Sequence, residues 1–259
     1  MPSAGTSGQV KGAQTLDRGL QVLEAVARSA DPVSVSEAAL TVGLDRRVAH
    51  RLITTLAARG YLQRDGGDGY RLGPTCLSLA SAISDLRTLA HPFLEELADL
   101  SGETAHLVVL SGREVVFIDG IESRKALRVG NRTGRLLPAN ATSVGKAWLA
   151  AMEPSQVEAL YGSTKHLPSV TDQTIVDTAV LGAELDLIRE RGYATSHGES
   201  EDGVGSVGMA VCGIGGQPRL AVSVAMPLAR LTAATEAAAA ADLAAVAERL
   251  ESRLSLLAT

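Results

Sequence analysis

Aromatic residues, cysteines and long apolar runs are all scarce in this 259-residue chain. Aromatic residues make up 3% of it, so its cores have to be built from leucine, valine, isoleucine and alanine. Two cysteines, Cys76 and Cys212, are too few for a disulfide framework and lack metal-ligand spacing. The chain has no run of about 18 apolar residues, so the sequence predicts no membrane-spanning helix.

The beginning of the chain lacks the apolar core of a secretory signal. It reads MPSAGTSGQVKGAQ, and we expect residues 1–14 to form a disordered tail. The low cysteine content fits a reducing compartment, which leads us to expect a cytoplasmic protein. With 46% hydrophobic and 20% charged residues, the remainder has the composition of an ordinary globular protein.

Charge is distributed unevenly along the chain. The net charge of −5 alone argues against nucleic-acid binding, but residues 1–75 hold nine basic and seven acidic residues. Residues 76–259 hold 15 basic and 22 acidic residues. A weakly basic first part followed by an acidic second part favours a small DNA-binding head on a larger domain with another role.

The pattern of the first part predicts a winged helix-turn-helix over residues 15–74. Helical spacing covers residues 16–29, and Ser34-Val-Ser-Glu37 is a capping-box sequence that starts a second helix. Gly43 suits the end of that helix, and Asp45 can cap a third helix that runs to about Arg59. Two short strands at 61–64 and 70–72, joined by a glycine-rich turn, form the wing.

The third helix carries two different faces. Because each residue advances the helix by about 100°, its apolar and polar side chains separate. The apolar side holds Val48, Ala49, Leu52, Ile53 and Leu56, and the polar side holds Arg46, Arg47, His50, Arg51 and Thr54. Such a helix can pack on a core while it offers cations and forked donors to the major groove of DNA. We expect Arg46, Arg47 and Thr54 to read base edges, and Arg64 and Arg71 of the wing to contact phosphates.

The remaining sequence predicts an α+β domain over residues 91–259, joined to the head by a linker helix in residues 75–90. Pro92 is expected to start a new helix that ends at Leu100. Beyond it the apolar period changes to two, which predicts an antiparallel sheet flanked by helices. The expected strands are 104–110, 114–121, 126–130, 193–197, 204–212 and 219–226, and the expected helices are 143–152, 177–190 and 232–257.

The chain resembles the IclR family of bacterial transcription regulators over nearly its whole length after the tail. In the head, LDRGLQVLEAV, GLDRRVAHRLITTLAARGYL and YRLGPTCLSLA follow the order and spacing of the family. In the second part, GRLLPANATSVGKAWLA, IRERGYATSHGESEDGVGSVGMAV and LAVSVAMPLARL do the same. The resemblance implies a GAF-like domain that binds a small-molecule effector. It also implies a homodimer or a tetramer built as a dimer of dimers, acting on a palindromic or repeated operator in double-stranded DNA, in many members as a repressor.

Carried over position by position, the resemblance implies an effector pocket between the sheet and the helix of the GKA block. Its walls would be Leu127, Val129, Ser143, Val144, Ser196, Ser206, Ser223 and Ala225. The start of a helix favours an anion, and serine hydroxyls can hold a carboxylate through neutral hydrogen bonds. The chain departs from the family at Ala225-Met226, where many members have Ser-Gly, and this loss of one donor favours a less polar ligand.

Three other motifs have competing interpretations. Gly203-Val-Gly205-Ser-Val-Gly208 matches a dinucleotide fingerprint, but strand residues follow it where a helix is required. Ser143-Val-Gly-Lys146 matches an acyl-enzyme pattern without its companion motifs, so Ser143 is better explained as a cap or ligand donor. The carboxylates after His197 (Glu199, Glu201 and Asp202) could bind a metal, but a solvated loop explains them better.

We therefore predict a DNA-binding regulator that responds to a small molecule, with no catalytic residues, no cofactor, no metal and no membrane association. Two alternatives remain at this point. One is a sensor or scaffold whose helical head binds protein, and the other is a serine hydrolase that uses Ser143 and Lys146. The basic face of the 45–59 helix argues against the first alternative, and the missing companion motifs argue against the second.

Overall fold

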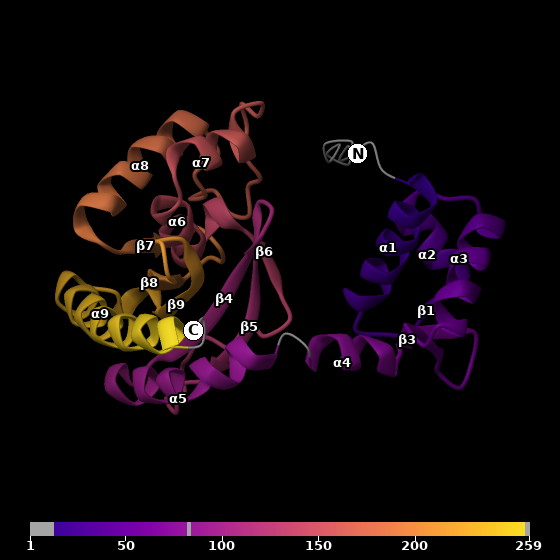
Figure 1. Ribbon diagram of the computed structural model, residues 1–259, viewed down its shortest axis with the longest axis horizontal. Helices are drawn as coiled ribbons and strands as arrows, with labels where there is room; N and C mark the ends of the chain where they lie inside the picture. Colours follow the sequence, from indigo (N-terminus) through magenta and orange to yellow (C-terminus); the bar gives the residue numbers. More distant parts are fainter. Residues whose placement is uncertain (1–12, 82–83, 257–259) are drawn as a thin grey trace. The chain divides into compact units, whose positions relative to one another are not determined.

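The computed structural model describes residues 13–81 and 84–256. The chain divides into two compact units, Met1–Asp85 and Leu86–Thr259 (Figure 1). The boundary falls within the predicted linker 75–90, where α4 (Pro74–Ser81) and the start of α5 (Ser84–Ser101) are helical. Of the predicted tail, residues 1–12 lie outside the described part of the chain.

The first unit is a winged helix-turn-helix. Its elements are α1 (Gln14–Ala27), β1 (Val33–Ser34), α2 (Val35–Val42), α3 (Arg46–Ala58), β2 (Leu62–Arg64) and β3 (Gly69–Leu72). The strands form an antiparallel sheet in the order β1-β3-β2, in which β2 and β3 are the wing. This arrangement confirms the fold predicted for the head.

Local capping signals start and stop the helices of the head. The Ser34 hydroxyl accepts from the Glu37 backbone N–H at 3.3 Å, and the Ser34 N–H donates to the Glu37 carboxylate at 2.8 Å. Gly43 ends α2 with φ +68°, a left-handed conformation that glycine adopts without the penalty of a Cβ. Asp45 then caps α3 by accepting from the Arg47 backbone N–H at 2.8 Å. The capping box of α2, the end of α2 at Gly43 and the start of α3 at Asp45 are therefore confirmed.

The second unit is built on one six-stranded sheet in the order β6-β5-β4-β9-β8-β7, with every neighbouring pair antiparallel. Its strands are β4 (Thr104–Ser111), β5 (Glu114–Ile121), β6 (Leu136–Pro138), β7 (Ala194–His197), β8 (Val204–Cys212) and β9 (Pro218–Pro227). Its helices, besides α5, are α6 (Ser143–Ala151), α7 (Pro154–Tyr161), α8 (Thr178–Arg191) and α9 (Ala233–Leu256), with short 3-10 turns at Ala139–Ala141 and Leu228–Arg230.

Helices cover both faces of this sheet (Figure 1). One apolar cluster joins α5 and α9 to alternate residues of the sheet, among them Leu107, Val222 and Val224. A second cluster joins α6, α7 and α8 to the opposite face, where Val108 and Ala221 are buried. The predicted α+β class is therefore confirmed, and the leucine stripe of α9 packs within its own unit.

Two local expectations were wrong, and one helix was not predicted. Pro92 lies inside the continuous helix α5 and does not begin a new one. Residues 126–130 form no strand, because side chains bind their carbonyls: Thr104 Oγ1 donates to Val129 O at 2.6 Å and Arg230 Nη2 to Leu127 O at 2.9 Å. Helix α7 was missed, although Pro154 at its first turn and the Glu153–Gln156 capping box are recognisable start signals.

Candidate DNA-binding surface and ligand pocket

The exposed face of α3 carries the polar residues that the sequence assigned to DNA. Ala49, Leu52 and Ile53 are buried in the core of the head, as predicted. The opposite side exposes Arg46, Arg47, His50, Arg51 and Thr54. The Thr54 hydroxyl donates to the His50 carbonyl at 2.8 Å, which leaves its oxygen as an acceptor. The four basic side chains are thus presented together on one exposed helical surface.

The two wing arginines are engaged to different degrees. Arg64 Nε donates to the Tyr70 hydroxyl at 3.3 Å, and its guanidinium lies 5.7 Å from the centre of the Tyr70 ring. Arg71 Nε donates to the Asp65 carboxylate at 2.5 Å and Arg71 Nη1 to the Ala30 carbonyl at 3.2 Å. Arg71 therefore anchors the wing to the head, while Arg64 is the more available cation.

In the second unit, the predicted effector residues around α6 are buried and close together. The Ser143 and Ser206 hydroxyls lie 2.8 Å apart. Across the sheet Ser206 lies opposite both Ala225 and Ser196, and Ser223 lies opposite Gly208. The Ser196 hydroxyl is buried without a hydrogen-bond partner in the described structure. Neutral hydroxyls therefore gather where α6 begins, a position that suits an anionic or polar ligand group.

Gly208 allows β8 to approach the start of α6. A Cβ at this position would lie 2.8 Å from the Val144 nitrogen and 2.8 Å from the Ser143 carbonyl carbon. The third glycine of the fingerprint-like motif therefore serves close packing between a strand and a helix. Strand β8 continues to Cys212, so the helix that a dinucleotide site requires does not follow.

Thr142, and not Ser143, caps α6: its hydroxyl accepts from the Gly145 backbone N–H at 3.0 Å. Lys146 is 1% exposed, and its ammonium lies 2.8 Å from each carboxylate oxygen of Glu199. The expectation that Glu199 belongs to a solvated loop was therefore wrong, because this carboxylate is buried to balance a lysine. Among the described residues, no group of three or more His, Cys, Asp or Glu could hold a metal ion.

His106 lies in β4, opposite Ser223 on one side and Gly120 on the other. Its ring contacts Phe117 edge to face, with centroids 5.2 Å apart, and its Nε2 atom is buried without a partner in the described structure. Burial, aided by the charge of Arg132, lowers the pKa of His106 to about 4. The imidazole is therefore neutral at pH 7.

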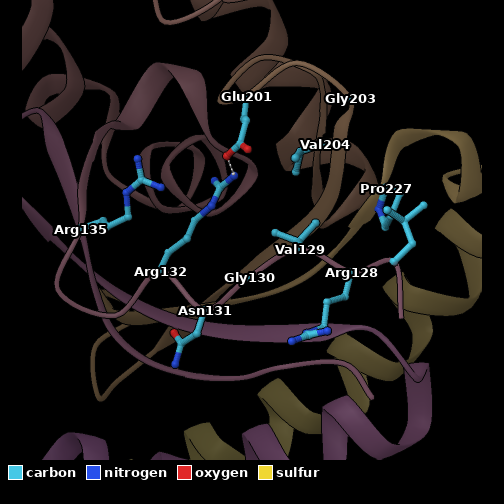
Figure 2. Close-up of a pocket in the computed structure, with 11 residues that line it drawn as sticks. Arg128, Val129, Gly130, Asn131, Arg132, Arg135, Glu201, Gly203, Val204 and Pro227 are labelled. Carbon is cyan, nitrogen blue, oxygen red and sulfur yellow. Dashed lines mark hydrogen bonds and ion pairs between the residues drawn. The ribbon is translucent and has the colours of Figure 1, made fainter. Parts of the chain in front are cut away.

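A cavity of about 370 Å³ lies beside this region (Figure 2). The loop between β5 and β6, the turn before β8 and the end of β9 form its walls. Leu127 and Val129 line it, Leu127 with 68% of its surface exposed and Val129 buried. The other six predicted effector residues are all buried. Sequence reasoning missed Arg132, a buried cation of this cavity, because nothing in the local pattern of residues 124–135 distinguishes it from its exposed basic neighbours.

The comparisons with known proteins cover both units. Residues 15–66 match the model of the IclR helix-turn-helix domain, and residues 79–252 match that of the bacterial transcriptional regulator IclR C-terminal domain. The transcriptional repressor IclR of Escherichia coli is 32% identical over 236 residues, which cover 89% of this chain and 85% of that protein. The acetate operon repressor of Salmonella typhimurium is also 32% identical, over 89% of this chain and 86% of its own length.

Solved structures agree with this similarity. A putative IclR regulator from Silicibacter superposes with a TM-score of 0.82 at 28% identity, over 93% of this chain and 96% of that one. An IclR homologue from Microbacterium hydrocarbonoxydans, solved in complex with 4-hydroxybenzoate, has a TM-score of 0.77 at 26% identity, over 93% of this chain and 99% of its own. Within the described residues, no helix is long and apolar enough to cross a membrane.

Proposed function

This chain belongs to the IclR family of bacterial transcriptional regulators, and on that premise we propose that α3 binds operator DNA under the control of a small molecule held in the second unit. The protein is a transcriptional regulator and not an enzyme. The observation that carries the DNA-binding surface is the exposed face of α3, where Arg46, Arg47, His50 and Arg51 stand opposite the buried residues of the same helix.

Roles within that surface follow from position. Arg46 and Arg47 occupy the first turn of α3, the part of a recognition helix that usually enters the major groove, and their forked donors match guanine edges. Thr54 offers its hydroxyl oxygen deeper along the same face. Arg64 at the wing contacts phosphate, while Arg71 positions the wing through Asp65 and Ala30.

The effector is proposed to bind between α6 and the sheet. The supporting observation is the group of buried hydroxyls at the start of α6, which includes the Ser143–Ser206 pair and the unpartnered Ser196 Oγ. Ser223, Val144, Ala225, Val129 and Leu127 complete the proposed site. The 4-hydroxybenzoate bound by the Microbacterium relative supports an organic acid as the ligand class.

We further propose a cytoplasmic homodimer, or a dimer of such dimers, that represses its operon at a palindromic or repeated operator. Exposed leucines on α1 support self-association: Leu16 is 64% and Leu20 48% exposed. Two heads would then meet half-sites about 34–36 Å apart, or a multiple of that distance. Light scattering on the purified chain tests the assembly, and an operon reporter in cells with and without the gene tests repression.

The DNA-binding surface is tested by replacing Arg47 and Arg51 together with alanine. We expect the double variant to melt like the wild type, because both side chains are exposed, and to lose specific binding to DNA from its own upstream region. Arg28→Ala with Arg59→Ala is the matched control, since it removes two exposed arginines of the head that lie off the proposed face. A footprint retained by the Arg47/Arg51 variant would contradict the assignment.

A further inference from the structure

The cavity in Figure 2 is basic although the whole protein is acidic. Arg128, Arg132 and Arg135 line it together with Glu201, and Glu122 pairs with Arg128, so three cations against two carboxylates leave a formal charge of +1. The full chain carries −5. Positive charge concentrated in a concave site on an acidic protein indicates attraction for an anion at this place.

Arg132 is the buried member of this group. Its side chain is 7% exposed, its Nη2 atom lies 2.7 Å from Glu201 Oε2, and its Nη1 donates to the Ser200 hydroxyl at 3.3 Å. Burial is the largest cause that lowers the pKa of Arg132; Glu201 opposes it and the nearby charge of Arg135 adds to it. A buried guanidinium next to a second arginine needs an anionic partner, because an uncompensated buried charge is costly.

Glu201 is an exchangeable partner for that guanidinium. Its side chain is 57% exposed and lies on the turn before β8, so its carboxylate can return to water at little cost. Arg128 has its own partner, Glu122, at 2.9 Å. The ion pair of Arg132 with Glu201, drawn as a dashed line in Figure 2, is therefore the contact that an incoming carboxylate can replace with the same geometry.

The rest of the cavity suits a hydrocarbon group. Val129, Val204 and Pro227 line it beside the arginines. A volume of about 370 Å³ lies at the small end of the range for ligand pockets, roughly 300–1,000 Å³. The cavity therefore fits a short-chain or single-ring acid.

We propose that Arg132 is the anion-recognition residue for a small organic carboxylate, whose carboxylate replaces that of Glu201 in this cavity, with Arg135 adding positive charge. The proposal rests on the function proposed above and assigns acid recognition to a residue outside the serine group at α6. Release of Glu201 should change the environment of α6. Glu199 lies two residues earlier on the same turn and forms an ion pair with Lys146 of that helix. Trp148, the single tryptophan of the chain, lies on α6 and provides a natural fluorescent reporter.

The test is a titration of the full-length protein with benzoate, 4-hydroxybenzoate, phenylacetate and butyrate, each beside its neutral amide, followed by calorimetry and Trp148 fluorescence. We expect at least one acid to bind and its amide to bind roughly tenfold more weakly or worse. Arg132→Gln should weaken binding of that acid by a similar factor, and Arg132→Lys should restore part of it. Glu201→Gln should bind the acid more tightly, because the internal competitor is gone.

Matched controls separate recognition from general charge effects. Arg124→Gln removes a 93%-exposed arginine from the same loop, and Glu190→Gln removes an exposed carboxylate of α8; both should bind like the wild type. Melting temperatures show whether each variant folds. Should Arg132→Gln fail to fold, Glu201→Gln still tests the proposal, since a merely structural ion pair would give equal or weaker binding in that variant.

Two results would overturn the proposal: equal acid affinity in folded Arg132→Gln and the wild type, or no binding of any acid to the wild type and Glu201→Gln. Operator binding in the same samples distinguishes this failure from that of the proposed function. If an acid releases the operator from Arg132→Gln as well as from the wild type, the proposed function is supported and Arg132 is not the residue that recognises the acid. If an acid binds through Arg132 but the wild type binds no DNA specifically, the proposed function is wrong and the assignment of Arg132 to acid recognition is supported.

Discussion

The ammonium of Lys146 and the carboxylate of Glu199 form a buried ion pair, although 53 residues separate them in the chain. Side-chain exposure is 2% for the lysine and 10% for the glutamate. The pair joins α6 to the turn before β8, and Glu184 of α8 lies 3.8 Å from the same ammonium. The ammonium of Lys146 is therefore the point where α6, α8 and the turn before β8 meet.

Replacing one member of this pair should lower the free energy of unfolding more than replacing both members does. Lys146→Met leaves Glu199 buried without its counter-charge, and we expect a loss of about 3–5 kcal/mol in the free energy of unfolding. The double variant with Glu199→Gln should recover part of that loss, because no charge then remains uncompensated. Urea denaturation of the two single variants and the double variant measures the coupling, and additive losses would show that the pair is not energetically linked.

Acid should destabilise the second unit through His106. The pKa of its imidazole is about 4 in the folded protein, against 6.5 for the free side chain, chiefly because of burial. Above pH 6.5 the imidazole is neutral in both the folded and the unfolded protein, so its titration takes nothing from the free energy of unfolding. As the pH falls from 6.5 towards 4, the unfolded state takes up a proton that the folded state excludes, so roughly 3 kcal/mol is lost.

His106→Gln isolates this effect from the titration of carboxylates. We expect the variant to lose less of its stability between pH 7 and pH 4.5 than the wild type does, in urea denaturation at the two values. The comparison uses the difference between pH values, so a uniform cost of the substitution cancels. An identical acid loss in both proteins would mean that His106 is protonated without penalty.

The two wing arginines should give opposite results. Arg64→Ala is expected to weaken binding to operator and scrambled duplexes alike, and to reduce the salt slope of binding by about one, as a phosphate contact does. Arg71→Ala should instead lower the melting temperature of the head, because it breaks the contacts with Asp65 and Ala30. Anisotropy and thermal melts of both variants decide between these roles, and a sequence-selective loss in Arg64→Ala would contradict the phosphate assignment.

Gly208→Ala tests the close contact between β8 and α6. The new Cβ would meet backbone atoms of Ser143 and Val144 at 2.8 Å, and backbone cannot rotate away as a side chain can. We expect a loss of about 1–3 kcal/mol and a changed Trp148 emission as α6 shifts. Gly182→Ala in α8 is the matched control, because the new methyl group would find no atom within 4 Å and the substitution should be neutral or stabilising.

The head could be predicted almost completely because its signals are local. Ser34 with Glu37, Gly43 and Asp45 each act within a few residues of their position in the chain, and the spacing of α3 separates its buried and exposed faces. The helix across Pro92 could not be predicted in this way. Ala90, Leu94 and Leu97 are fully buried against the sheet, and this packing outweighs the hydrogen bond that the proline removes.

The charged contacts of the second unit depend on distant residues. Arg132 and Glu201 are 69 residues apart, and β4 and β9 separate β5 from β8 in the sheet, so the β5–β6 loop has to pass both strands to reach the turn before β8. The 126–130 segment has the apolar pattern of a strand, but side chains of Thr104 and Arg230 bind its carbonyls. No spacing rule contains this information. The serine group at α6 was predictable only through the resemblance to the family.

Operator recognition by α3 is tested most directly by fluorescence anisotropy of the purified protein with a duplex from its own upstream region, beside a scrambled duplex, at three salt concentrations. We predict much tighter binding to the upstream duplex and a steep decrease in affinity with salt, because the proposed contacts of α3 and the wing would neutralise phosphates. Weak binding that is equal for both duplexes, together with no enrichment from a library of genomic fragments, would contradict the assignment of the Arg46–Thr54 face to operator DNA.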